Sequence, residues 1–222
     1  MNESRPSARL RIARLLVVVC GLAIWFWTQS LIGAKPPVAG GHGIGDAIHE
    51  WTAPWNAWLH EHASAANALL IASSAGIDAM GLFVIGATIF GRSVRPFLGL
   101  ILLFGLRQVC QALCSLPPPE GMIWRHPGFP SLLVTYGVSN DLFFSGHTAL
   151  AVYGAMELAR LGRWPFVWLA PVAGIVQITI VLVLRAHYTM DVFAGAVTAV
   201  LVAMLAERMA GPCDRWLACR AG

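Results

Sequence analysis

Six long apolar stretches constrain this chain more than any other feature of its sequence. They run over residues 12–33, 64–90, 97–116, 143–160, 164–184 and 189–208. A helix needs about 20 apolar residues to cross the hydrocarbon of a bilayer, and each stretch is close to that length or above it. Only 12% of the 222 residues are charged, about half the fraction in soluble domains. We therefore predict an all-α membrane protein with six transmembrane helices in a single polytopic domain over residues 1–222. The first stretch follows a basic segment, so a cleaved signal peptide is its alternative interpretation.

The arginines are distributed unevenly between the two sides of the predicted spans. If the spans alternate in direction, eleven arginines lie on the side of the termini, whereas Lys35 and Arg125 lie on the other. Cytoplasmic loops are rich in lysine and arginine, which predicts that both termini are cytoplasmic. We expect a multi-pass protein of a bacterial inner membrane, with the outer ends of the last three spans facing the periplasm. No nucleic-acid partner is expected, because the basic residues lie at segment ends.

Two predicted outer segments have distinctive compositions. Residues 44–62 contain Trp51, Trp55 and Trp58 at helical spacing, which is typical of a helix that lies in the membrane interface. Residues 116–139 are rich in proline and glycine and are expected to form a lid or wall over an outer site. No metal site is predicted, because the histidines and the five cysteines lack ligand spacing.

Two polar strings near the outer ends of the last three spans contain candidate reactive groups. One is Ser-Gly-His-Thr at residues 145–148 and the other is His-Tyr-Thr-Met-Asp at residues 187–191. The first is typical of a helix start, where free backbone N–H groups favour an anion such as phosphate. In the second, His187 and Asp191 are four apart, which would place them on one face of a helix. The carboxylate would hold one imidazole nitrogen and leave the other free to attack phosphorus.

Either histidine alone has a plain structural interpretation, namely a core imidazole that is hydrogen-bonded to a nearby carbonyl. Two histidine-containing strings at the same membrane depth and on the same side are better explained by one shared site. We therefore expect the rings of His147 and His187 to converge.

These strings resemble the signature of the type 2 phosphatidic acid phosphatase superfamily, six-span membrane enzymes that work through a phosphohistidine. The resemblance is closer to the sphingomyelin synthase branch, whose Cys-Gly-Asp-x-x-x-Ser-Gly-His-Thr motif is in register with residues 139–148. The branch's His-Tyr-Thr-x-Asp-Val motif matches residues 187–192, and Arg107 with residues 116–119 is similar to its arginine and Leu-Pro-x-Pro segment. The resemblance covers about residues 105–195.

The chain departs from that branch at two places. Ser139 and Asn140 replace the Cys-Gly pair, and residues 193–197 replace the tyrosine-rich stretch of the animal enzymes. These departures leave the histidine motifs intact and put the head group and the acceptor in question.

The resemblance implies a role for each residue of the two strings. His187 is expected to be the nucleophile, and Asp191 to fix its tautomer. His147 is expected to protonate the departing oxygen and then to accept the proton of the incoming acceptor. Ser145 and the backbone N–H groups of Gly146 and His147 would hold the phosphoryl oxygens.

Four further charged residues have open assignments. Arg185 is a candidate cation for the phosphate, with an interfacial anchor as its alternative. Asp141 could bind a cationic head group, orient His147 or cap the helix. Arg107 either binds the phosphate or forms an ion pair with Asp78 inside the membrane.

We therefore predict a phosphotransferase that moves a phospholipid head group to a ceramide-like or other lipid alcohol, or to water, at the outer leaflet. The few cations near the site suit a phosphodiester, which has one negative charge, better than a phosphomonoester. A lipid phosphate phosphatase is the alternative enzyme, and a non-catalytic lipid-binding scaffold is the alternative of another class. No cofactor is expected, and a homo-oligomer is left open.

Overall fold

The computed structural model describes residues 44–114, 116–134, 136 and 142–221, and these ranges contain helices without strands. The predicted first span at 12–33 and the candidate Asp141 lie outside the described residues. The helices are α2 (Ala47–Trp51), α3 (Ala53–Glu61), α4 (Ala63–Ile89), α5 (Arg95–Leu113), α6 (Gly146–Ala159), α7 (Trp164–Val183) and α8 (Thr189–Ala221).

Four of these helices are long and apolar enough to cross a membrane: α4, α5, α7 and the first 28 residues of α8. They correspond to the second, third, fifth and sixth predicted spans, so the chain is an integral membrane protein. The predicted fourth span at 143–160 instead forms α6, which has 14 residues and is about 21 Å long. That length is shorter than the hydrocarbon core, about 30 Å thick. The predicted count of six spans is therefore not confirmed.

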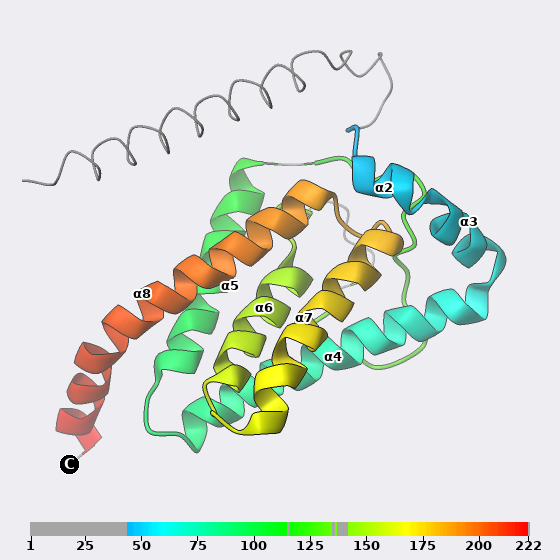
Figure 1. Cartoon of the computed structure of the whole chain (residues 1–222). Helices are drawn as coiled ribbons and strands as arrows, with labels where there is room; N and C mark the ends of the chain where they lie inside the picture. Colours follow the sequence, from blue (N-terminus) through cyan, green and yellow to red (C-terminus); the bar gives the residue numbers. More distant parts are fainter. Residues whose placement is uncertain (1–43, 115, 135, 137–141, 222) are drawn as a thin grey trace, which may run out of the picture. The chain divides into compact units, whose positions relative to one another are not determined.

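Helix α6 is short and is surrounded by protein. It packs against α4, α5, α7 and α8 (Figure 1), and its side chains include the buried Tyr153 and Glu157. The non-helical backbone ahead of it finds partners within the protein: the N–H of Ser145 donates to the carbonyl of Asp191 (3.0 Å), and Arg107 Nε donates to the carbonyl of Phe144 (3.1 Å). Irregular backbone is tolerated at membrane depth only where it is satisfied in this way.

The opposite end of α6 is held by an ion-pair network. Arg95 of α5 lies 2.7 Å from Glu157 of α6 and 3.0 Å from Glu207 of α8, and Arg160 lies 2.6 Å from Glu207. The network joins three helices at the end of the bundle that is remote from His147. Which end faces the cytoplasm remains a prediction.

The predicted interfacial segment forms two helices, α2 and α3, which meet at Thr52. Pro54, which has no backbone N–H, lies in the first turn of α3, where that donor has no helical partner. Trp51, Trp55 and Trp58 are exposed, as expected of side chains at head-group level. The opposite side of the segment contacts the rest of the protein, because His49 and Asn56 are buried.

The proline- and glycine-rich loop reaches the middle of α4. Asp78, about 22 Å along that helix, accepts hydrogen bonds from the N–H groups of Leu132 (2.8 Å) and Leu133 (2.9 Å). The predicted ion pair between Asp78 and Arg107 is therefore wrong. The carboxylate satisfies two backbone donors of the loop, and a lone acidic residue in a span does not reveal which donors it will meet.

Replacing Asp78 with asparagine should loosen this loop. The amide has one acceptor oxygen for two N–H groups, and losing one of these exposed hydrogen bonds costs about 0.5–1.5 kcal/mol. We expect a lower melting temperature in detergent and faster proteolysis between residues 116 and 134. Glu61→Gln, at an exposed residue, is the control. An unchanged melting temperature and cleavage pattern in Asp78→Asn would contradict this role.

Candidate active site

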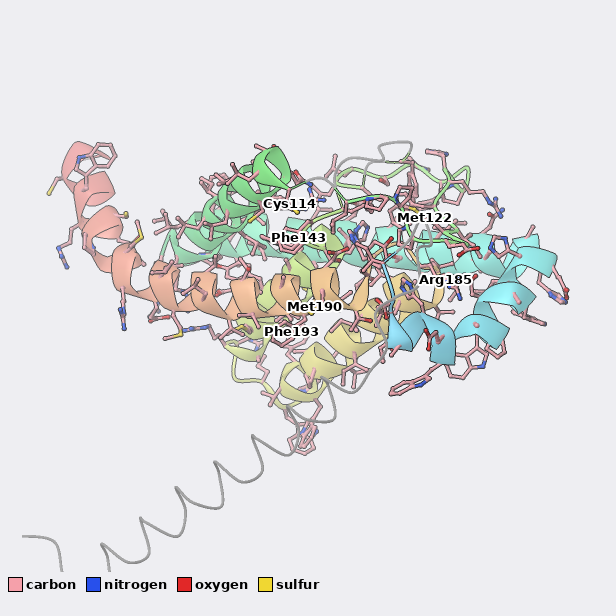
Figure 2. All side chains as sticks on the ribbon, turned by 90° about the horizontal axis from the view of Figure 1, so that it is seen from above. Cys114, Met122, Phe143, Arg185, Met190 and Phe193 are labelled. Carbon is pink, nitrogen blue, oxygen red and sulfur yellow. The ribbon has the colours of Figure 1, made fainter. Side chains whose placement is uncertain are left out.

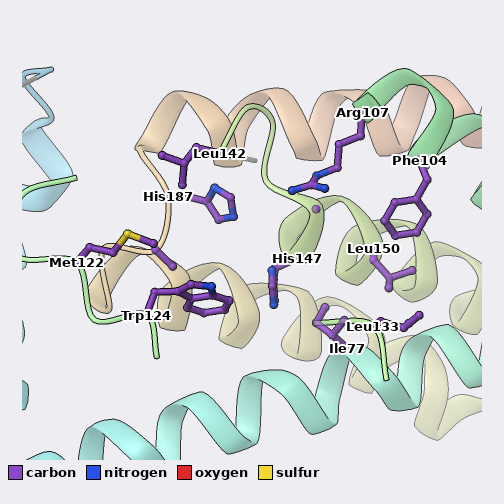
Figure 3. A pocket seen from close by; sticks show the side chains of 12 residues that line it. Ile77, Phe104, Arg107, Met122, Trp124, Leu133, Leu142, His147, Leu150 and His187 are labelled. Atoms are coloured by element: carbon purple, nitrogen blue, oxygen red, sulfur yellow. The ribbon is translucent and has the colours of Figure 1, made fainter. Parts of the chain in front are cut away.

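A small cavity lies at the end of the bundle where α6 and α8 begin (Figure 3). Its volume is about 50 Å³, which is room for a few water molecules or a phosphoryl group and not for a lipid tail. Helices α4, α5 and α6, the loop and the turn before α8 all contribute lining residues. Those with polar or aromatic groups are Phe104, Arg107, Trp124, His147 and His187.

The two histidines converge in this cavity. Their ring centroids are 6.3 Å apart, with an angle of 51° between the ring planes. His147 lies in the first turn of α6, and the edge of its ring meets Trp124 at a centroid distance of 5.0 Å. The sequence prediction that the two rings share one site agrees with this geometry.

The Ser-Gly-His string starts a helix, as its sequence predicts. Ser145 is the N-cap residue of α6, and its hydroxyl accepts a hydrogen bond from the N–H of Thr148 (3.3 Å). This is the usual function of serine at that position. Both residues are predicted to bind the phosphoryl group. Gly146 lines the cavity, whereas Ser145 is fully buried and does not line it.

His187 lies in the turn before α8 rather than on the helix, so the prediction of a shared helical face is wrong in that detail. Helix α8 begins at Thr189, and the carboxylate of Asp191 accepts a hydrogen bond from the N–H of Tyr188 (3.0 Å). An acidic residue in the first turn often caps the helix by reaching back in this way. Asp191 Oδ2 still lies 3.8 Å from His187 Nδ1.

Two residues that line the cavity have a buried polar atom with no hydrogen-bond partner among the described residues: His147 (Nε2) and His187 (Nδ1). The same holds for Oδ1 of Asp191, whose other carboxylate oxygen lies 3.8 Å from His187 Nδ1. Buried polar atoms are nearly always paired in folded proteins. Atoms of this kind beside a cavity indicate a place for a polar ligand or water.

Arg107 contributes a positive charge to the cavity, and Figure 3 shows its guanidinium on the side of the cavity where the histidines lie. Gly146 permits this approach, because a Cβ atom there would lie 2.9 Å from Arg107 Nε. Of the two assignments left open by the sequence, this location favours a phosphate-binding function.

Gly146→Ala tests whether this close approach matters. The added methyl group would displace the guanidinium from the cavity, and we expect kcat/KM to fall about tenfold or more. Helix stability should not fall, since alanine is a better helix former than glycine. Gly105→Ala is the matched control, because a Cβ atom there meets nothing within 4 Å. Equal activity of the two variants would contradict the assignment.

Arg185 is directed away from the cavity, towards α2 and the loop. Its NH1 donates to the carbonyl of Glu120 (2.8 Å) and its NH2 to the carbonyl of His49 (3.0 Å). It does not line the cavity and lies at the α2 end of the bundle (Figure 2). Its backbone is left-handed (φ 52°), at the helix C-terminus where glycine is usual. Arg185 therefore links three segments, and the structure gives no support to its predicted phosphate contact.

The fold and the cavity define a helical membrane protein with two histidines in one enclosed site. The model of the AtPDCT1/2 family matches residues 46–208, and the chain belongs to that family. The match includes both histidine strings. No solved structure matches the chain.

Two curated relatives come from Arabidopsis thaliana. The chain is 26% identical over 144 residues to phosphatidylcholine:diacylglycerol cholinephosphotransferase 2. The aligned residues make up 64% of this chain and 47% of that protein. The chain is also 26% identical over 114 residues to phosphatidylcholine:diacylglycerol cholinephosphotransferase 1. Those residues make up 51% of this chain and 36% of that protein. The chain thus spans less than half the length of the curated relatives it matches.

These findings support part of the predicted resemblance. Both relatives are head-group transferases by name, whereas the sphingomyelin synthase branch is not confirmed. The relatives are plant proteins, so they give no support to the predicted bacterial inner membrane or periplasmic face.

Proposed function

We propose that this protein transfers the phosphocholine head group of phosphatidylcholine to a diacylglycerol through a phosphohistidine at His187. The observation that carries the proposal is the pair of imidazoles, buried for His187 and partly buried for His147, with centroids 6.3 Å apart beside the guanidinium of Arg107. The names of the two plant relatives support the choice of head group and acceptor.

In the first step, a ring nitrogen of His187 attacks phosphorus. Nδ1 lies towards Asp191, so Nε2 is the nitrogen available for attack. The bond between phosphorus and the glycerol oxygen breaks, and His147 gives a proton to that oxygen as it leaves. Diacylglycerol departs, and phosphocholine remains bonded to His187. Asp191 stabilises the positive charge that develops on the ring.

In the second step, the hydroxyl of the acceptor loses its proton to His147 and its oxygen attacks phosphorus. The bond between phosphorus and His187 breaks, which restores both histidines and yields a new phosphatidylcholine. One residue can serve both steps, because the acid of the first is the base of the second.

The charge of the cavity favours a phosphodiester. Among the described residues that line it, Arg107 is the only arginine or lysine. A phosphodiester has one negative charge, whereas a phosphomonoester such as phosphatidic acid brings nearly two and favours several cations. This supports head-group transfer over the action of a lipid phosphate phosphatase.

The size of the cavity supports a division of the substrate between protein and bilayer. A space of about 50 Å³ accommodates the reacting phosphoryl group, so the acyl chains would stay in the membrane. The arginine distribution favours the extracytoplasmic leaflet for this reaction.

The purified protein in liposomes tests this proposal. Head-group-labelled phosphatidylcholine is incubated with a diacylglycerol of different chain length, with ceramide, or with no acceptor, and products are separated by mass. We expect labelled phosphatidylcholine with the acceptor's chains, and none from His187→Ala. Labelled sphingomyelin alone would make ceramide the acceptor, and free phosphocholine without acceptor would indicate hydrolysis.

Two further results would overturn the proposal. Release of inorganic phosphate from phosphatidic acid, without any head-group transfer, would identify a lipid phosphate phosphatase. Lipid binding that is equal in wild type and His187→Ala, with no product from either, would indicate a scaffold.

A further inference from the structure

Helix α2 contacts the turn that contains His187. His49 is buried, and its Nε2 lies 3.0 Å from the backbone carbonyl oxygen of His187. A carbonyl oxygen can only accept, so Nε2 has the hydrogen and donates it. The ring of His49 also stacks on Tyr188, with centroids 5.8 Å apart.

Asp46 joins α2 to the start of α8. One carboxylate oxygen accepts the N–H of Thr189 (2.6 Å) and the other accepts its hydroxyl (2.7 Å). The same carboxylate caps α2 by accepting the N–H groups of Ile48 (3.0 Å) and His49 (3.3 Å). A single side chain therefore fixes the beginnings of two helices relative to each other.

These contacts matter because His187 is not held by a helix. It lies between the end of α7 at Val183 and the start of α8 at Thr189. Arg185, two residues before His187, donates to the carbonyl of His49 (3.0 Å), and Thr189, two residues after His187, donates to Asp46. The turn is therefore fixed to α2 before, at and after His187.

We propose that Asp46 and His49 are positioning residues that hold the backbone of His187 so that its ring faces His147. This inference rests on the proposed function, since it assigns these residues to the same reaction. Neither residue lines the cavity, so both act through His187 rather than on the substrate. A displacement of about 1 Å in a reacting group can cost about a hundredfold in rate.

The charge of Asp46 suits this position. Burial would raise the pKa of its carboxyl, but hydrogen bonds from the backbone and the hydroxyl of Thr189, together with His49, hold the pKa below the ordinary value of 3.8. The stabilisation that these bonds provide is present above that ordinary value and is lost as the pH falls through the lowered pKa. The carboxylate is therefore ionised at neutral pH and accepts all four hydrogen bonds.

His49→Leu and His49→Gln test this inference. Leucine removes the donor, whereas the side-chain amide of glutamine can place an N–H near the position of Nε2. We expect kcat for head-group transfer to fall about 10- to 100-fold in His49→Leu, with KM for phosphatidylcholine within about twofold. Glutamine should restore most of kcat. His62→Leu is the matched control, because the ring of His62 is hydrogen-bonded to the carbonyl of Trp58 and stacks on its indole.

A second measurement does not depend on turnover. The rate at which diethyl pyrocarbonate modifies His187, followed by mass spectrometry, reports the exposure of its ring. We expect this rate to change in His49→Leu and in the double variant Asp46→Asn/Thr189→Val, and to stay at the wild-type value in His62→Leu. The double variant keeps the test available if His49→Leu does not fold.

The outcomes separate the two proposals. A wild-type kcat and an unchanged modification rate in His49→Leu would overturn the positioning function while leaving the transfer reaction intact. A fall in kcat that glutamine does not reverse, with lower thermal stability and no change at His187, would also overturn it by indicating a general structural effect. An inactive wild type with a changed modification rate would overturn the proposed reaction and support the positioning of His187.

Discussion

Head-group transfer is expected to fall by about 10⁴-fold or more in His187→Ala, because removal of a nucleophile removes the covalent route itself. Alanine leaves a gap in the cavity wall and does not alter the motif around Ser145. The measurement is the initial rate of labelled phosphatidylcholine formation in liposomes at saturating donor and acceptor.

His126→Ala is the matched control for this prediction. His126 is exposed in the loop and does not line the cavity, so the variant should retain the wild-type rate. Retention of about a tenth of wild-type activity by folded His187→Ala would be incompatible with a nucleophilic His187.

The second large effect is expected at His147, and it should depend on the leaving group. A diacylglycerol oxygen leaves poorly without a proton, so His147→Ala should slow the first step with phosphatidylcholine by about 10²- to 10⁴-fold. A nitrophenolate needs no proton to leave. The single-turnover release of nitrophenol from p-nitrophenylphosphocholine should therefore be far less affected.

Equal losses on the two substrates would contradict the assignment of His147 as the acid. They would instead indicate that His147 binds the phosphoryl group in both cases. Thermal melting of the variant, compared with wild type, shows whether either loss comes from unfolding.

The sequence predicts the long helices well because their apolar runs are unambiguous. The stretches at 64–90 and 164–184 correspond closely to α4 and α7. The stretch at 143–160 is less apolar, since it contains Glu157 and Arg160, and it forms the short α6. Apolar composition does not distinguish a helix that faces lipid from one surrounded by protein, and the fourth predicted span is therefore not confirmed.

The prediction that the rings of His147 and His187 converge agrees with the structure. The predicted partners of the charged residues Arg185 and Asp78 do not. Arg185 has the residue type and the nearness to His187 that a phosphate ligand needs. Its left-handed backbone and its bonds to Glu120 and His49 depend on long-range contacts. The predicted ion pair of Asp78 with Arg107 failed for the same reason, because the hydrogen-bond donors of Asp78 are backbone N–H groups of a distant loop.

Asp46 and His49 were missed because no local pattern connects them to a motif about 140 residues away. Aspartate is common at the N-cap of a helix, so Asp46 at the start of α2 gives no sign of a further function. Its second function, as an acceptor for Thr189, depends on the packing of α2 against the end of α7.

The most direct test of the account is to trap the covalent intermediate. Wild-type protein is mixed with phosphatidylcholine in the absence of acceptor and quenched in alkali, because a phosphorus–nitrogen bond to histidine is labile to acid, and its peptides are then mapped by mass. We expect a phosphocholine adduct on the peptide that contains His187, absent from His187→Ala and discharged by added diacylglycerol. Transfer that proceeds without any adduct, or an adduct on a different residue that is discharged at the rate of turnover, would contradict it.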